Sequence, residues 1–180
     1  LGQPRKIAAA LGEWFRNVDE KELFERLELE RPATMTPLRF LHNLIEKARS
    51  DRRSIVLPEG YDPRILRAAS IIVRRDFCDL TLIGNPEKIA EICQRESIDL
   101  PIAEDGKRGV TIIDLDNNDY TDDFAKTYAE LRAHKGMTLE GAQNRMMDPS
   151  YFGTMLVHKG IVDGMVSGAV NTTANTIRPS

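Results

Sequence analysis

Apolar residues occur in two spacings along the chain. Consecutive apolar residues predict strands buried on both faces, and apolar residues that recur every three or four positions predict amphipathic helices. The expected strands cover residues 54–57, 80–83, 110–113 and 161–166. After a first helix that begins at Pro37, the expected helices cover residues 63–75, 86–95, 122–135, 139–147 and 149–158. Because such strands alternate with helices, we predict the α/β class, with a three-layer parallel sheet that has helices on both faces.

Several of these helices carry a start signal. A side chain that can cap a helix precedes a proline at Thr36-Pro37, Asp62-Pro63 and Asn85-Pro86, and Thr138 stands before another helical segment. The helix after Thr36 also has one apolar stripe, formed by Leu38, Leu41, Leu44, Ile45 and Ala48. That stripe predicts that this helix packs on the sheet.

The first residues differ from the rest of the chain. Residues 4–16 and 20–29 are expected to form two amphipathic helices with no strand between them, so they cannot make a core alone. We expect residues 1–34 to be a helical linker or the end of a preceding N-terminal region, and residues 35–180 to form the next domain. Because Leu1 stands where a translation product normally has Met, we expect the chain to be a piece of a longer protein.

Composition narrows the class of protein. The 180 residues are 41% hydrophobic and 29% charged, which is typical of a globular protein with one core. With a net charge of -3, the chain has no overall positive charge that would favour binding to nucleic acid. The sequence also contains no run of 18 to 20 apolar residues, which a membrane-spanning helix needs. The two cysteines, Cys78 and Cys93, fit reduced thiols, so we expect a cytoplasmic protein.

Candidate chemistry follows the strands, because ligands of parallel sheets bind beyond the carboxyl ends of the strands. Arg64 begins the helix after the first strand and could bind an anion, although the same residues also read as an ordinary capped turn. Arg132 lies in a cation-rich helix end and could bind phosphate with two parallel hydrogen bonds, or its charge could simply complement the helix dipole.

The segment of residues 163–179 carries a more specific signal. After a strand it contains two glycines, several hydroxyl residues and then Arg178, a combination that is rare in a solvated loop. Such a loop can place backbone N–H groups and hydroxyls around an anion at a helix start. The residues concerned are Ser167, Gly168, Thr172 and Thr173.

Other kinds of site are not indicated. The acidic run that begins at Asp114 resembles the start of a calcium loop, but Asp119 stands where that loop needs Gly and Ala125 where it needs Glu. The chain has no phosphate-binding loop of the Gly-x-x-x-x-Gly-Lys type and no dinucleotide motif, and its three histidines are dispersed. We therefore expect no metal ion and no permanently bound cofactor.

Four motifs, in this order, resemble the phosphate acetyltransferase (phosphotransacetylase) family, and the resemblance spans residues 37–179. The matching stretches are Ile55-Val-Leu-Pro-Glu-Gly with Asp62-Pro-Arg64, Leu82-Ile-Gly-Asn-Pro86, Glu130-Leu-Arg-Ala-His-Lys-Gly-Met-Thr138, and Val162-Asp-Gly-Met-Val-Ser-Gly-Ala-Val-Asn-Thr-Thr-Ala-Asn-Thr-Ile-Arg-Pro179. The resemblance implies the first part of a two-domain fold, and it places residues 1–32 at the end of the N-terminal region of the long form of the enzyme.

The resemblance also implies an activity, the reversible transfer of an acetyl group between coenzyme A and inorganic phosphate. The substrates would be acetyl-CoA, phosphate and acetyl phosphate, and the full-length protein would be a homo-oligomer. By position in the motifs, Arg64, Arg132 and Arg178 match family arginines that bind substrate, and residues 167–173 match the phosphate-side loop. The catalytic base and a transition-state Ser of the family lie beyond Ser180, so this chain alone is expected to be inactive. Asn171 stands where many members carry His, which keeps a donor and loses a titratable group.

Other functions stay open at this point. A phosphate butyryltransferase is the alternative enzyme, and the C-terminal domain of malic enzymes is a related regulatory domain; the intact stretch of residues 167–178 favours the acetyl enzyme over both. A non-catalytic module that binds anions through the three arginines is the alternative from another class.

Overall fold

A computed structural model describes residues 35–103 and 108–179. The chain divides into two compact units, residues 1–41 and 42–180, and the sheet belongs to the second. The helices are α3 (Pro37–Ser50), α4 (Pro63–Arg75), α5 (Pro86–Arg95), α6 (Thr121–Leu131), α7 (Leu139–Met146), α8 (Pro149–His158) and α9 (Thr173–Ile177), and the strands are β1 (Ser54–Leu57), β2 (Asp79–Ile83), β3 (Thr111–Ile113) and β4 (Gly164–Met165). The helices expected over residues 4–16 and 20–29 lie outside the described residues.

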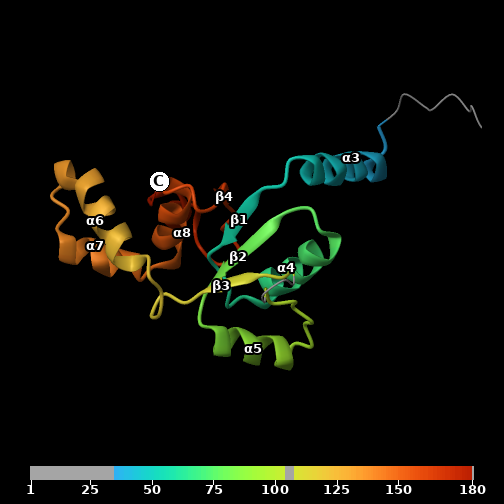
Figure 1. Ribbon diagram of the computed structural model, residues 1–180, viewed down its shortest axis with the longest axis horizontal. Helices are drawn as coiled ribbons and strands as arrows, with labels where there is room; N and C mark the ends of the chain where they lie inside the picture. Colours follow the sequence, from blue (N-terminus) through green and yellow to red (C-terminus); the bar gives the residue numbers. More distant parts are fainter. Residues whose placement is uncertain (1–34, 104–107, 180) are drawn as a thin grey trace, which may run out of the picture. The chain divides into compact units, whose positions relative to one another are not determined.

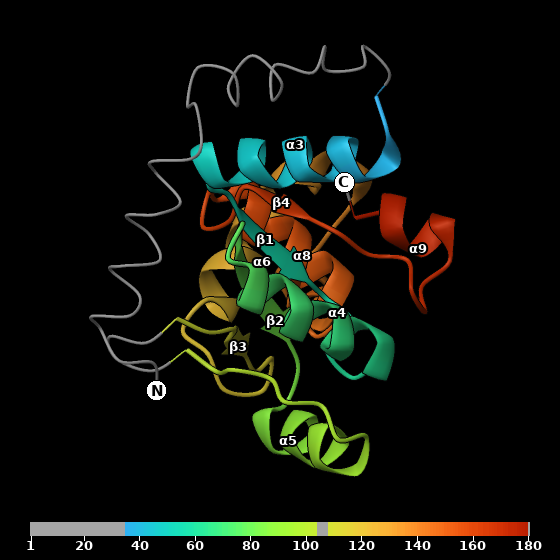
Figure 2. The same cartoon turned by 90° about the vertical axis from the view of Figure 1, so that its right-hand side faces the viewer.

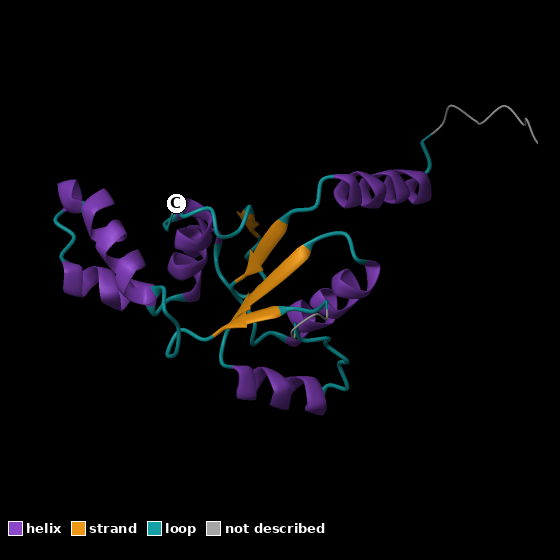
Figure 3. Cartoon of the chain, in the orientation of Figure 1, coloured by secondary structure: helices purple, strands orange, loops and turns teal. Residues whose placement is uncertain are grey.

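The sheet is parallel, as expected, with the strand order β3-β2-β1-β4 (Figure 3). β1 lies against β2 through four residue pairs that begin at Ser54 and Asp79, and against β4 through Ile55–Gly164 and Val56–Met165. Neighbouring strands that run the same way bring their carboxyl ends to one edge of the sheet. The loops that follow β1 and β4 therefore start side by side.

Each face of the sheet carries its own core. Val56 and Ile83 pack with Phe124 of α6 and Phe152 of α8 on one face, whereas Leu57 packs with α4 and α5 on the other. This follows from the alternation of side chains along a strand. Figure 1 shows α6, α7 and α8 on one side of the sheet and α4 and α5 on the other, so the predicted three layers are confirmed.

The predicted helix starts are confirmed by hydrogen bonds. The side chains of Asp62, Asn85 and Thr138 accept bonds from backbone N–H groups in the first turns of α4, α5 and α7. Each bond satisfies a donor that the helix itself leaves unpaired. No helix of the described residues has both the length and the apolar character needed to cross a membrane.

Three expectations about elements were wrong. The helix expected over residues 122–135 ends at Leu131, and a 3-10 turn, η1 (Ala133–Lys135), replaces its last turn. The strand expected over residues 161–166 is only β4, because the N–H of Ile161 still bonds to the Leu156 carbonyl and closes the end of α8. None of the residues of α3 is buried, although its stripe predicted packing on the sheet; helices from later in the chain cover both sheet faces instead.

Candidate functional site

The order in which the chain adds strands to the sheet reverses at β1. The next two strands in the chain, β2 and β3, lie in the sheet beyond one edge of β1, and β4 pairs with the opposite edge of β1. Ligands of open parallel sheets bind at such a switch point, in the crevice between the loops that follow the two strands on either side of it. Here those loops are residues 58–62 after β1 and residues 166–172 between β4 and α9 (Figure 2).

The loop after β4 is wrapped around a carboxylate of the loop after β1. Glu59 is only 1% exposed, and its two oxygens accept hydrogen bonds from four consecutive backbone N–H groups. Oε2 accepts from Gly168 and Ala169 at 3.1 and 2.8 Å, and Oε1 accepts from Val170 and Asn171 at 2.8 and 2.7 Å. The sequence predicted that N–H groups of this loop surround a bound anion; in the structure, the N–H groups of residues 168–171 bind the carboxylate of Glu59.

These bonds keep Glu59 ionised. Burial alone raises the pKa of the Glu59 carboxyl, but the four backbone N–H groups stabilise the carboxylate and leave the pKa below its ordinary value. Gly168 helps the loop to close around the carboxylate, because its φ of 115° lies in the region that favours glycine. A buried negative charge therefore lies at the centre of the candidate site.

Arg64 also contacts the loop after β4. Its Nε and Nη2 atoms donate to the two Asp62 oxygens at 3.0 and 2.8 Å, and Nη2 also donates to the Ala169 carbonyl at 2.7 Å. The Arg64 side chain is still 70% exposed, whereas that of Asp62 is 10% exposed. The guanidinium thus has one edge fixed by the protein, and it lowers the pKa of the Asp62 carboxyl. Much of its surface is available to an incoming anion.

Asp62 makes two kinds of contact, and a pair of variants tests one of them, the helix cap. Its Oδ1 caps α4 by accepting from the Arg64 N–H at 2.8 Å, and its carboxylate also holds the Arg64 side chain. Asp62→Ala is expected to destabilise the protein by about 0.5–2 kcal/mol through the lost cap. Asp62→Asn is expected to stay within about 0.5 kcal/mol of the wild type, because Asn caps as well as Asp. Denaturant unfolding measures both, and equal losses in the two variants would contradict the capping role.

The side chains of the other predicted residues in this loop have different surroundings. The Asn171 amide donates to the Ser150 hydroxyl at 3.3 Å, and Ser150 is buried at the start of α8. The Thr172 hydroxyl accepts from the Asn175 N–H and caps α9, where Thr173 is the first residue. Ser167 Oγ is buried and has no hydrogen-bond partner among the described residues, which leaves this hydroxyl unsatisfied.

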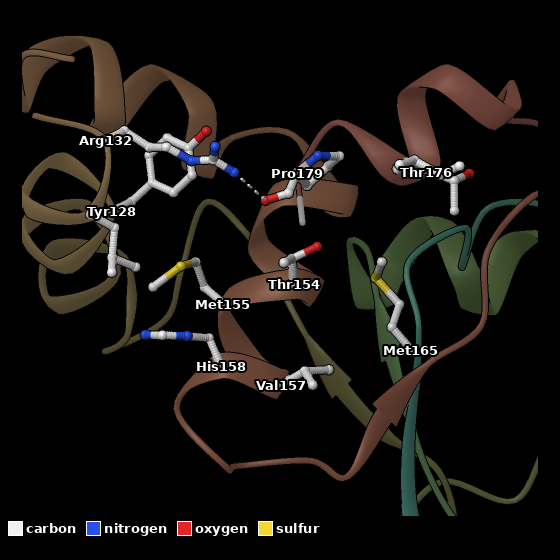
Figure 4. Close-up of a pocket in the computed structure, with 11 residues that line it drawn as sticks. Tyr128, Arg132, Thr154, Met155, Val157, His158, Met165, Thr176 and Pro179 are labelled. Carbon is white, nitrogen blue, oxygen red and sulfur yellow. Dashed lines mark hydrogen bonds between the residues drawn. The ribbon is translucent and has the colours of Figure 1, made fainter. Parts of the chain in front are cut away.

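Arg132 and the end of α9 lie together at a pocket of about 560 Å³. The Arg132 guanidinium lies over the Tyr128 ring, 5.8 Å from its centroid, and its Nη2 atom is 3.5 Å from the Pro179 carbonyl oxygen (Figure 4). Arg178, one residue before Pro179, is exposed. Arg64 and Arg132 therefore contact the segment after β4 at two different points. The pocket is lined by Tyr128, Leu131, Arg132, Thr154, Met155, Val157, His158, Met165, Thr176, Ile177 and Pro179.

The sequence reasoning missed Glu59 and Ser150. Glu59 stands in the motif Leu57-Pro-Glu-Gly60, directly after a buried strand, and this position could have marked it as a site residue. No sequence pattern indicated Ser150, because a serine is an ordinary residue in the first turn of a helix. Over residues 35–103 and 108–179, no group of three or more His, Cys, Asp or Glu side chains could hold a metal ion.

Known proteins resemble this chain over most of its length. The family described as phosphate acetyl/butaryl transferase matches residues 39–180. A phosphate acetyltransferase of Nitratidesulfovibrio vulgaris is 45% identical over 98% of the chain, and one of Acetivibrio thermocellus is 46% identical over 78%. The solved structure of a phosphotransacetylase from Streptococcus pyogenes covers 81% of the chain with a TM-score of 0.70 and 33% identity.

The chain is shorter than these relatives. It spans 24% of the Nitratidesulfovibrio protein and 40% of the Acetivibrio protein. It also spans 42% of the Streptococcus chain. The shared region includes both loops at the switch point, since the family match begins before β1 and extends to residue 180.

Proposed function

Because the chain belongs to the phosphate acetyl/butaryl transferase family, we propose that it forms part of an enzyme that transfers an acetyl group reversibly between coenzyme A and inorganic phosphate. The observation that carries this proposal is the exposed Arg64 guanidinium, fixed at the carboxyl edge of the sheet by Asp62 and the Ala169 carbonyl. A fixed guanidinium at a switch point suits a phosphoryl group, because its positive charge is held in place and the N–H groups of its Nη1 atom are not used by Asp62 or Ala169.

The proposed reaction places negative charge near these residues. When the coenzyme A thiolate attacks the acetyl phosphate carbonyl, the bond to phosphate breaks and phosphate leaves with its charge. Cationic donors already fixed in place stabilise that charge without reorganising. We assign Arg64 to the phosphoryl oxygens, with the Thr172 and Thr173 hydroxyls and the Asn171 amide as further polar contacts of the same loop.

Arg132 and Arg178 would bind other phosphate groups of the substrates. Arg132 is one of the residues that line a mostly apolar pocket, and the size of this pocket suits a small organic ligand. Coenzyme A combines phosphate groups with a long, largely neutral arm, which matches an arginine beside apolar side chains. A cytoplasmic location and a homo-oligomeric full-length protein complete the proposal.

An assay of the full-length protein that contains this chain tests the proposal. With acetyl phosphate and coenzyme A, we expect phosphate release and thioester formation in equal amounts. The family description covers both acetyl and butyryl transfer, so butyryl phosphate is the matched second substrate. A higher kcat/KM for acetyl phosphate supports the acetyl enzyme, a higher value for butyryl phosphate supports the alternative, and no turnover of either contradicts the proposal.

The non-catalytic anion-binding module is tested separately by a titration. Acetyl phosphate is added to the purified chain and to its Arg178→Ala variant. If the full-length protein is inactive and Arg178→Ala binds acetyl phosphate at least 10-fold more weakly, a difference of about 1.4 kcal/mol, the module is supported. Equal affinities of the two chains would remove it.

A further inference from the structure

We propose that Glu59 is a positioning residue: its carboxylate holds the loop of residues 167–173 in the shape that binds the phosphoryl group. This role rests on the proposed function, because it concerns the same site. It assigns Glu59 no contact with substrate. Its effect would come through the four backbone N–H groups that it binds and through Arg64.

The first support is how completely the carboxylate is used. Each Glu59 oxygen accepts two N–H groups, at distances of 2.7 to 3.1 Å, and the side chain has almost no exposure to water. The donors are the four consecutive amides of residues 168–171, so the whole turn is fixed through its backbone. None of these four bonds uses a side chain of the loop.

The second support is a direct link to Arg64 through one residue. The Ala169 N–H donates to Glu59 at 2.8 Å, and the Ala169 carbonyl accepts from Arg64 at 2.7 Å. A shift of this peptide would move the acceptor that fixes the guanidinium. Glu59 therefore sets the position of Arg64, the cation that we assign to the phosphoryl group, without touching it.

The third support is that Asn171 is held twice. Its N–H donates to Glu59 at 2.7 Å, and its side-chain amide donates to Ser150 at 3.3 Å. Because Ser150 belongs to α8, the loop is fastened both to the residues after β1 and to the helix that covers the sheet. Loss of the carboxylate would release the first attachment and leave the second.

The chemistry of the clamp requires a carboxylate. An ionised carboxylate has only acceptor sites and can receive all four N–H groups, whereas a glutamine amide presents its NH₂ donors to two of them. Glu59→Gln therefore keeps the size of the side chain and removes half of the clamp. Glu59→Asp keeps the charge and withdraws the carboxylate by one methylene, which gives a second variant if the glutamine protein does not fold.

The test compares these variants with the wild-type full-length enzyme. For Glu59→Gln we expect the KM for acetyl phosphate to rise at least 10-fold, with kcat changed less than about threefold and the KM for coenzyme A within about twofold. We also expect faster hydrogen exchange in the peptide that covers residues 166–172. Leu80→Ala is the control. Leu80 is a buried residue of β2 in the core that β2 shares with α4 and α5, so this variant shows what a loss of stability alone does to KM and to hydrogen exchange.

The outcomes separate this inference from the proposed function. If the wild type does not convert acetyl phosphate, the proposed function fails, and faster exchange in residues 166–172 of the variant still supports the clamp. If the wild type is active but Glu59→Gln or Glu59→Asp leaves both KM and exchange unchanged, the positioning role is wrong. A rise in the acetyl phosphate KM of Leu80→Ala equal to that of Glu59→Gln would also overturn it.

Discussion

Arg64→Ala is expected to lower kcat/KM for acetyl phosphate in the full-length enzyme by about 100- to 1,000-fold, the usual effect of removing one donor to a developing negative charge. The guanidinium is held by Asp62 and by the Ala169 carbonyl, so its position is set before substrate arrives. Alanine removes every donor and lets water fill the space. Steady-state kinetics with acetyl phosphate at saturating coenzyme A measures the loss.

Arg67→Ala is the matched control for this prediction. Arg67 lies one turn further along α4 and pairs at the surface with Glu96 at 2.9 Å. An exposed pair of this kind contributes little to stability, and the residue is not part of the switch-point loops. We expect kcat/KM within about twofold of the wild type. Similar losses in the two variants would show that the loss reflects general charge rather than the position of Arg64.

Gly60→Ala is expected to destabilise the protein by about 1–3 kcal/mol and to disturb the site at the same time. A Cβ atom at residue 60 would lie 2.6 Å from the Ile83 carbonyl oxygen, and that oxygen belongs to the backbone at the end of β2. The chain would have to move away from β2 directly after Glu59. Denaturant unfolding and the KM for acetyl phosphate measure the two effects.

Gly153→Ala adds the same methyl group at another close approach. There the nearest atom is Met165 Sδ at 2.8 Å, in a side chain that can change its rotamer. We expect a smaller loss of stability than for Gly60→Ala. A loss in Gly153→Ala that equals or exceeds that of Gly60→Ala would contradict the argument that backbone contact determines the cost.

Local signals predicted the elements of the fold well, because the apolar patterns and the caps act within a few residues. Asp62, Asn85 and Thr138 cap the helices that the sequence assigned to them. The errors arose where neighbouring structure decides. The N–H of Lys135 bonds to the Arg132 carbonyl, only three residues back, and this bond tightens the chain into η1. The run of good helix formers from Glu130 to Lys135 does not indicate this change.

The site was harder to predict than the fold. The sequence identified the loop of residues 163–179 and Arg64 as candidates, and the structure brings the two together through the Ala169 carbonyl. The sequence did not identify Glu59, because a carboxylate next to an expected anion site would repel the anion. Its role becomes clear only when its oxygens are seen to accept hydrogen bonds from the N–H groups of the loop. These bonds depend on the pairing of β4 with β1, which no local pattern contains.

The Glu59 clamp also bears on how the protein folds. Its donors lie 109 to 112 positions beyond Glu59 in the chain, so the clamp cannot form before β4 has reached its place beside β1. Contacts between such distant positions form slowly, because a long loop must close first. During synthesis, β1 and β2 can pair while the Glu59 carboxylate is still in water. We therefore expect the loop that carries the candidate site to be among the last parts of the described chain to gain its structure.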